Sequence, residues 1–155
     1  MSYIKELRNK VGHETIIMPC ACLLIVDNKG NVLLQHRVDN KLWGYHGGSI
    51  EVDEKVEDAL KREVKEELNI DLLSYSLFKI YSGKEFHYTY PNKDVVSPID
   101  ILFISSQFNG DFKLQKEEID GIKWFSIYAM PKNMTIGLKV VINDYIKAFE
   151  EGRKF

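Results

Sequence analysis

The chain has 155 residues, of which 45% are hydrophobic and 28% are charged, and its formal net charge is −2 with only two cysteines. This composition is typical of a globular protein, and it excludes bulk disorder, the basic surface that duplex nucleic acid requires and a scaffold held by disulfides. The length predicts one domain over residues 1–155. The lack of a long apolar run or of an apolar leader predicts a cytoplasmic protein without a membrane partner. We expect it to be a monomer or a homodimer.

The predicted elements begin with a short amphipathic helix over residues 3–11 and a buried strand over residues 16–26. Turn residues at 27–31 predict a hairpin that leads into a second strand at 32–34. Cys20 and Cys22 lie two residues apart on the first strand and share one of its faces. Because no further pair of Cys or His residues supplies the missing ligands of a metal site, we expect both thiols to pack in the core.

A glycine-rich loop then leads to the most clearly patterned helix, which we expect over residues 54–68. Asp53 is a suitable N-cap, and Asn69 can adopt the left-handed conformation that ends a helix. Further strands are predicted over residues 72–81, 86–90, 99–108 and 122–127, before a final helix whose apolar residues recur at helical spacing. Helices separated by several strands predict an α/β fold with a mixed sheet packed between helices.

Three glutamates of the 54–68 helix fall on or beside its apolar face. At about 100° per residue, Glu67 lies about 40° from Glu63, within the apolar arc, and Glu66 lies about 60° from Glu63 on the other side. Burial of unpaired carboxylates is costly, so these groups need a counter-ion. Hard divalent cations such as Mg²⁺ bind to a few carboxylates together with water and substrate phosphate. The helix therefore predicts a metal site.

Residues 48–70 read GSIEVDEKVEDALKREVKEELNI, which is similar to the Nudix box, G-x5-E-x7-R-E-U-x-E-E-x-G-U, where U is a bulky aliphatic residue. Asn69 stands where that family has Gly, and Asn is the next best residue for the required backbone conformation. Upstream, residues 42–48 resemble the family's Trp-x-x-Pro-Gly-Gly segment, with His46 in place of Pro, which predicts a looser loop. The matching box positions are Gly48, Glu54, Arg62, Glu63, Val64, Glu66, Glu67 and Ile70.

The resemblance implies a Nudix-type α/β/α sandwich with a mixed β-sheet. It also implies a metal-dependent hydrolase that cleaves the diphosphate linkage of a nucleoside diphosphate joined to another moiety, by attack of water on phosphorus. On this chain, Glu54 and Arg62 would brace the helix and orient the acids. The general base is a box glutamate or an acid of a later loop, and Glu118, beside Glu117, is our candidate. The implied ligands of Mg²⁺ or Mn²⁺ are Glu63, Glu66, Glu67 and the carbonyl of Gly47.

A small-molecule nucleotide substrate needs contacts beyond the metal. Arg37, at the end of the second strand, suits bidentate phosphate binding. Aromatic side chains can stack on any base, because every base has a π-face. The extended Ser-Gln-Pro-Trp-Pro-Phe array linked to NADH hydrolases is absent. Candidates for stacking are Trp43, Tyr45, Phe86, Tyr88 and Tyr90, of which we take Tyr45 and Tyr88 as substrate-binding residues.

Two other functions remain open at this point. A catalytically silent Nudix-fold module could sense or bind a nucleotide, although such modules tend to lose box acids and this chain has all of them. An isopentenyl diphosphate isomerase of the same fold would need a cysteine that faces the pocket. Here both cysteines lie side by side on an apolar strand, which favours the hydrolase.

Overall fold

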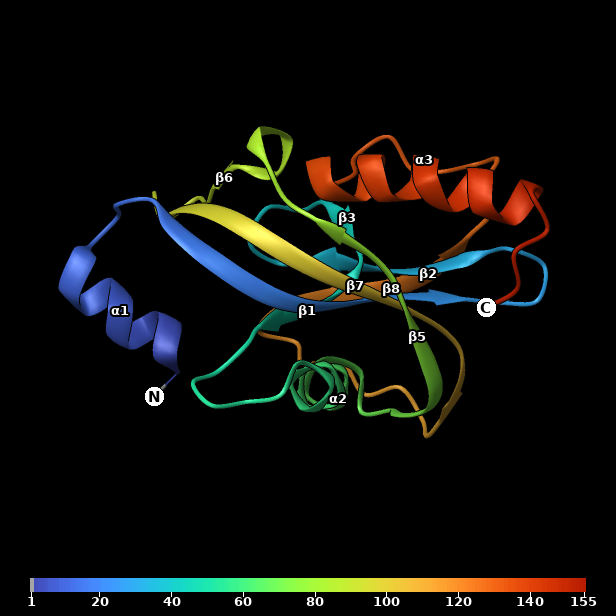
Figure 1. The fold of residues 1–155 in the computed structure, drawn as a ribbon, viewed down its shortest axis with the longest axis horizontal. Coiled ribbons are helices and arrows are strands. Elements are labelled where there is room, and N and C mark those ends of the chain that lie inside the picture. Colours follow the sequence, from blue (N-terminus) through green and yellow to red (C-terminus); the bar gives the residue numbers. More distant parts are fainter. Residues whose placement is uncertain (1) are drawn as a thin grey trace.

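The computed structural model describes residues 2–155, which form an eight-stranded mixed sheet with helices on both faces (Figure 1). The helices are α1 (Tyr3–Val11), α2 (Val56–Leu68) and α3 (Ile136–Glu150), with a 3₁₀ helix over Lys84–Phe86. The strands are β1 (Ile16–Val26), β2 (Val32–Arg37), β3 (Trp43–Gly44), β4 (His46–Ser49), β5 (Asp71–Tyr81), β6 (Tyr88–Thr89), β7 (Val95–Asn109) and β8 (Ile119–Phe125).

The main strand order is β3-β2-β1-β7-β5, while β4 pairs with β1, β6 with β7 and β8 with β2. The pairing of β1 with β7 is parallel, from Ile16 opposite Val96 to Ile25 opposite Ser105, and the other named pairs are antiparallel. Strand β1 lies in the middle of this order and is apolar along most of its length, as expected for a strand covered on both faces.

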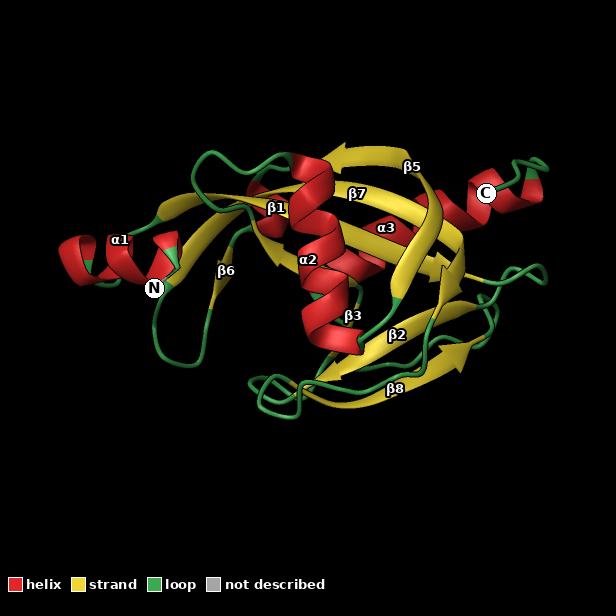
Figure 2. Cartoon of the chain, turned by 90° about the horizontal axis from the view of Figure 1, so that it is seen from below, coloured by secondary structure: helices red, strands yellow, loops and turns green. Residues whose placement is uncertain are grey.

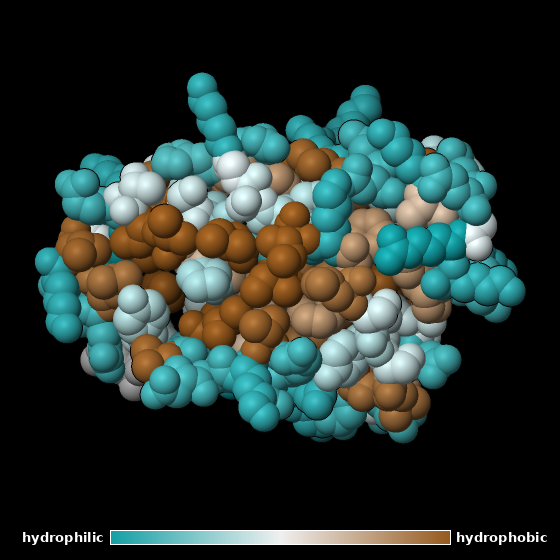
Figure 3. Space-filling view, viewed as in Figure 1, coloured by the Kyte–Doolittle hydropathy of each residue, from teal (hydrophilic) through white to brown (hydrophobic). Residues whose placement is uncertain are grey.

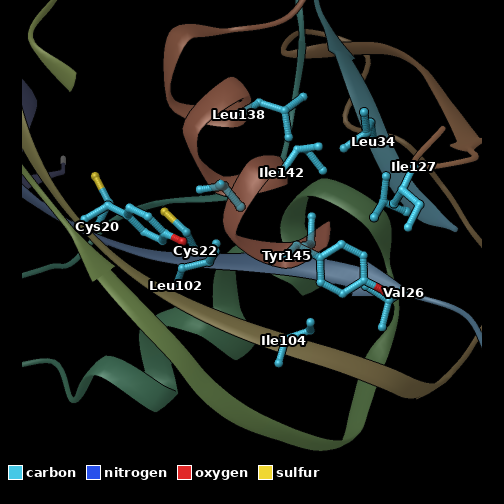
Figure 4. Close-up of a cluster of buried hydrophobic side chains, with 14 of the residues drawn as sticks. Cys20, Cys22, Val26, Leu34, Leu102, Ile104, Ile127, Leu138, Ile142 and Tyr145 are labelled. Atoms are coloured by element: carbon cyan, nitrogen blue, oxygen red, sulfur yellow. The ribbon is translucent and has the colours of Figure 1, made fainter. Parts of the chain in front are cut away.

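The two faces of the sheet carry separate hydrophobic cores. Figure 2 shows α2 lying across one face, where alternate residues of β1 such as Leu23 meet Leu60 and Val64 of the helix. The residues between them, such as Cys22, face α3 and pack with Leu138 and with other side chains drawn in Figure 4. The predicted α/β fold, with a mixed sheet between helices, is confirmed. Both cysteines are buried and free.

The glycine-rich loop contains two short strands that the sequence did not predict. Strand β4 pairs with β1, from Leu23 opposite His46 to Cys20 opposite Ser49. The segment His-Gly-Gly-Ser has little strand propensity, so its conformation depends on pairing with a distant strand. The looser loop expected from His46 is therefore wrong, because this residue is paired and fully buried.

Besides β7, which begins at Val95 instead of residue 99, two other strand predictions need correction. In the strand expected over residues 86–90, Phe86 instead belongs to the 3₁₀ helix, and only Tyr88–Thr89 pairs, with β7. The last strand begins at Ile119 instead of residue 122, because its pairing with β2 extends as far as Arg37. In both places tertiary pairing sets the strand bounds.

The start of the acidic helix also differs from the prediction. Helix α2 begins at Val56 with Lys55 as N-cap, and Asp53 has a positive φ of 61° instead of capping the helix. The preceding turn is held by Glu54, whose carboxylate accepts the backbone N–H of Glu51 at 2.9 Å and also binds an arginine of α2. The predicted end is confirmed, since Asn69 is left-handed with φ 60°.

The surface shows an uncovered apolar area along strand β5. Figure 3 shows apolar side chains gathered on the face where β5 and β7 lie in front in Figure 1. The exposed residues there include Leu73, Leu77 and Ile80, on a strand that ends the main strand order. None of the helices within residues 2–155 combines the length and the apolar character needed to span a bilayer.

Candidate active site

The three predicted metal ligands on α2 differ sharply in their exposure. Glu67 is 3% exposed, whereas the side chains of Glu63 and Glu66 are 15% and 53% exposed. This gradient follows the helical wheel, because Glu67 falls within the apolar arc and Glu66 lies at its rim. The acids therefore extend from the protein interior to the surface within one turn of helix.

Glu67 is a buried carboxylate without a cation. The backbone N–H of Gly47 donates to its Oε2 at 2.9 Å, and the side-chain amide of Gln35 donates to its Oε1 at 3.3 Å. None of the ion pairs found among residues 2–155 includes Glu67. Burial raises the pKa of Glu67 to about 8, more than its two hydrogen bonds lower it.

Arg62 holds the two neighbouring acids and the turn before the helix. Its guanidinium makes two hydrogen bonds of 2.8 Å to Glu54 and one of 2.6 Å to Glu63, and it lies 3.5 Å from Glu66. It also donates to the backbone oxygen of Ser49. The hydrogen bond from Arg62 lowers the pKa of Glu54, while burial raises the pKa of Glu63 despite the nearby arginine. These hydrogen bonds connect Glu54 and Glu63 through one guanidinium, and the bracing role of Glu54 and Arg62 in catalysis stays a prediction.

The donor chemistry of this cluster suits a hard divalent cation. Carboxylate and backbone oxygens are the ligands that Mg²⁺ prefers, and a buried anion such as Glu67 gains most from a cation. As they stand, no three His, Cys, Asp or Glu side chains in residues 2–155 are gathered closely enough to hold a metal. Arg62 binds Oε1 of Glu63, and because a carboxylate has about four lone-pair sites, Oε2 can still bind a cation.

Two glycines place the acids against the sheet. At Gly47, where φ is 119°, an added Cβ would lie 2.2 Å from the backbone oxygen of Ala21, so only glycine allows β4 to approach β1 this closely. At Gly48, an added Cβ would lie 2.5 Å from Oε2 of Glu63. The Gly47–Gly48 segment therefore touches both β1 and the acid cluster of α2.

A buried polar chain connects the acid cluster to β2. Nδ1 of His46 lies 3.0 Å from Oε1 of Gln35, and Nε2 of His46 lies 3.1 Å from the backbone oxygen of Leu33. Gln35 in turn bonds to Glu67, and both His46 and Gln35 are almost fully buried. Burial lowers the pKa of His46 to about 4, so the ring is neutral at pH 7. Gln35 was not predicted as a site residue, and because it is followed by the polar residues His36 and Arg37, the sequence of β2 does not single it out.

A pocket of about 160 Å³ opens beside Gly47 and Gly48 on the face of the sheet that carries α3. Strands β1 and β7 form its floor, and the 3₁₀ helix, β6 and the start of α3 contribute to its walls. The acid cluster and the pocket therefore meet at the same two glycines. The residues that line the pocket include Cys20, Cys22, Arg37, Tyr45, Phe86, Tyr88, Tyr90, Pro98, Asp100 and Gly137.

All three predicted substrate-binding residues line this pocket. Arg37 is held by Asp39 through hydrogen bonds of 3.0 and 2.8 Å. Tyr88 accepts a hydrogen bond of 3.0 Å from Asn40 and makes an edge contact with Tyr90 at a ring separation of 4.9 Å. Tyr88 is thus held by two side-chain contacts, and Arg37 already has an anionic partner.

Asp100 is a second carboxylate that the sequence analysis missed. It lies on the pocket floor, is 7% exposed and accepts a hydrogen bond from the hydroxyl of Tyr45. Cys20 and Cys22 line the same pocket, and the thiol of Cys20 donates to the backbone oxygen of Met18 at 3.6 Å. Burial raises the pKa of Asp100 despite the hydrogen bond from Tyr45. A lone Asp within an apolar strand, as in Pro98–Leu102, was the available sequence signal.

The positions of the two cysteines correct one part of the sequence analysis. Both thiols line the pocket, so the argument that they do not face it is wrong. The alternation of β1 places both on the α3 face, where the core gives way to the pocket. Burial raises the pKa of each thiol far above its ordinary value, and a protonated thiol is a poor nucleophile.

Glu118, the candidate general base, lies in a loop attached to the end of α2, because the backbone N–H of Gln115 donates to the backbone oxygen of Glu67 at 3.1 Å. Its side chain is exposed and accepts a hydrogen bond from Gln115 at 3.3 Å. Its charge contributes to the raised pKa of Glu63, for which burial is the main cause. The backbone oxygen of Glu118 accepts the N–H of Val38 at 2.9 Å, which fixes this loop beside the end of β2.

Sequence comparisons match most of the chain to one family of domains. The model of a family described as NUDIX domain matches residues 17–145. The NAD-capped RNA hydrolase NudC of Pasteurella multocida is 28% identical over 150 residues, which cover 92% of this chain and 53% of that protein. A putative 8-oxo-dGTP diphosphatase of Bacillus subtilis is 26% identical, with coverage of 81% and 77%. The chain spans about half the length of the NudC relatives that it matches.

Solved structures share the fold at lower sequence identity. The MutT NUDIX hydrolase from Burkholderia pseudomallei superimposes with a TM-score of 0.71 at 21% identity, over 83% of this chain and 98% of that one. The MutT protein from Methanosarcina mazei Go1 gives a TM-score of 0.68 at 23% identity, with coverage of 91% and 99%. The arrangement of sheet and helices is therefore that of known Nudix proteins.

Proposed function

Because the chain belongs to the Nudix family of hydrolases, we propose that it cleaves the diphosphate linkage of a nucleoside diphosphate joined to a further group X. Water attacks phosphorus, and the products are a nucleoside monophosphate and phosphorylated X. The observation that carries this proposal is the buried, cation-free carboxylate of Glu67 beside Gly47, where the acid cluster meets the pocket.

The acid cluster has the roles that the Nudix box implies. Arg62 and Glu54 hold the helix start and orient the acids, and Glu118 accepts the proton of the attacking water. The bound cation, Mg²⁺ or Mn²⁺, supplies charge stabilisation to the phosphate oxygens. Arg37 at the pocket wall contacts the same phosphates when it leaves Asp39. The groups that hold the cation are Glu63, Glu66, Glu67 and the carbonyl of Gly47.

The relatives support a nucleotide substrate and leave its identity open. Their names refer to NAD-capped RNA in one case and to 8-oxo-dGTP in another. NAD contains a diphosphate bridge between two nucleosides, and 8-oxo-dGTP is a nucleoside triphosphate, so both have a phosphoanhydride bond. The shared chemistry supports cleavage of such a bond, while the differing names support different groups beyond it.

The test is turnover of a panel of nucleoside diphosphate derivatives with Mg²⁺, with Mn²⁺ and with excess chelator. We expect a nucleoside monophosphate and phosphorylated X with either metal, and no turnover with chelator. Full activity in chelator contradicts the metal site. Free orthophosphate as the sole first product, from substrates without a terminal phosphate, contradicts the position of cleavage. Binding without turnover of any member supports the alternative of a catalytically silent nucleotide sensor.

A further inference from the structure

Asp100 is unusual because it places a carboxylate in a pocket that must accept an anionic substrate. None of the ion pairs found among residues 2–155 includes Asp100, and the hydrogen bond found to its carboxylate within these residues comes from the hydroxyl of Tyr45. Because a carboxylate has about four lone-pair sites, it can accept further hydrogen bonds from a ligand. Asp100 therefore suits the part of a ligand that carries N–H groups and disfavours the phosphates.

The sheet register gives the distance between Asp100 and the glycines beside the acid cluster. Asp100 lies opposite Cys20 on β1, and Cys20 lies opposite Ser49 on β4, next to Gly48. Neighbouring strands are separated by about 4.8 Å, so two strand spacings place Asp100 roughly 10 Å from this segment. A diphosphate at the glycines would thus have its attached nucleoside over the pocket floor, with the base near Asp100.

The walls around Asp100 suit a flat ring. Tyr45, Phe86, Tyr88 and Tyr90 line the same pocket, and aromatic side chains stack on bases of any sequence. Stacking therefore holds a base without selecting it, and selection falls to the polar groups at the edge of the ring. Of the Asp and Glu side chains within residues 2–155, only Asp100 lines this pocket.

We propose that Asp100 selects a guanine base, whose ring N–H and amino N–H point the same way and can both donate to one carboxylate. An ionised carboxylate only accepts hydrogen bonds. Adenine and cytosine present a donor beside an acceptor at the corresponding edge, and uracil presents one donor between two carbonyl oxygens, so each leaves an unfavourable contact. This inference rests on the proposed function, because it names the base at the far end of the same pocket.

The test measures binding of GMP, AMP, CMP and UMP by calorimetry in the presence of Mg²⁺. These monophosphates contain no anhydride bond, so the result does not depend on turnover. We expect the wild-type protein to bind GMP at least about tenfold more tightly than AMP, the discrimination typical of one bidentate pair. Equal affinities, tighter binding of AMP or no binding of GMP at millimolar concentration overturn the proposal.

Asp100→Asn tests the residue itself, because an amide offers a donor beside an acceptor. We expect the preference for GMP over AMP to fall below about threefold in this variant. The matched control is Asp111→Asn, which changes an exposed carboxylate outside the pocket and should keep the wild-type preference. A retained preference in folded Asp100→Asn overturns the assignment to Asp100, and if that variant does not fold, the wild-type comparison of GMP with AMP still decides.

Turnover of GDP-, ADP-, CDP- and UDP-glucose separates this inference from the proposed function. If the GDP sugar is cleaved fastest, the proposed hydrolysis and the selection of guanine are both supported. If all four are cleaved equally, the proposed function stands and the selection by Asp100 is overturned. Preferential GMP binding without any turnover supports the base selection and contradicts the hydrolysis.

Discussion

The two ends of the candidate site are built in different ways. The acid end takes its glutamates from one 13-residue helix, and an arginine of the same helix pairs with two of them. The pocket end collects side chains from β1, β7, the 3₁₀ helix, β6 and the start of α3, and its buried Asp100 is in none of the ion pairs found within residues 2–155. Helix pitch sets the geometry of the first end, whereas long-range strand register sets that of the second. A change at one end should therefore leave the other largely intact.

The largest expected effect follows from a change at Gly47, where the acid cluster and the pocket meet. Gly47→Ala places a Cβ 2.2 Å from the backbone of Ala21 at a positive φ, so β4 must move away from β1. We expect a loss of roughly 3 kcal/mol or more in the free energy of unfolding, with loss of activity. Denaturant unfolding measures the change in the free energy of unfolding.

Gly121→Ala is the matched control, because nothing lies within 4 Å of its added Cβ. We expect this variant to stay within about 0.5 kcal/mol of the wild type. A stable Gly47→Ala protein would show that β4 does not depend on this close approach and that the two ends are not joined there.

A second change weakens the acid end alone. Gln35→Leu removes the amide that donates to Glu67 and contacts His46. Groups that orient metal ligands typically account for about 10- to 100-fold in metal affinity, and we expect a loss of that size. The Mg²⁺ concentration at half-maximal thermal stabilisation measures it, with exposed Gln107→Leu as control. An unchanged midpoint contradicts the orienting role of Gln35.

The smallest expected effect concerns the pocket end and depends on pH. Burial raises the pKa of Asp100 above its ordinary value of 3.8, so the fold disfavours the ionised form. Wild-type stability is reduced as pH rises through the raised pKa, and Asp100→Asn removes this loss. We expect the variant to melt at the same temperature as the wild type or a few degrees higher at pH 7, with the gain disappearing toward pH 4.

Melting curves of both proteins over this pH range measure the difference. If Asp100→Asn melts clearly lower at pH 7 than the wild type, the hydrogen bond from Tyr45 stabilises the carboxylate by more than burial destabilises it.

The contrast between the two ends also explains what the sequence could predict. The positions of Glu63, Glu66 and Glu67 follow from their spacing on one helix, and Glu67 is buried as the helical wheel predicts. The strand character of β4, the burial of His46 and the approach of Gln35 to Glu67 all depend on pairing between segments far apart in the chain. Local patterns contain no information on that register.

The same reason accounts for the errors at the pocket. The alternation along β1 predicts that Cys20 and Cys22 share a face, but whether that face meets core or pocket depends on the placement of α3 and the 3₁₀ helix. Asp100 was missed because its register with Cys20 follows from the parallel pairing of β1 with β7. The helix was predicted to start at residue 54 because Asp53 resembles an N-cap. In the structure, residues 53 and 54 belong to a separate turn, in which Asp53 has a positive φ and Glu54 is bound by Arg62.

The central claim, that Glu67 is a metal ligand of a hydrolase, is tested most directly by comparing Glu67→Gln with Glu57→Gln. Both variants remove one charge from the same helix, but Glu57 is exposed and lies away from the acid cluster. With Glu67→Gln we expect turnover to fall by roughly 100-fold or more and the stabilisation by Mg²⁺ to shrink, while the metal-free protein is at least as stable as the wild type. With Glu57→Gln we expect wild-type turnover and the full rise in melting temperature with Mg²⁺. Equal turnover and equal Mg²⁺ stabilisation in the two variants would contradict the account.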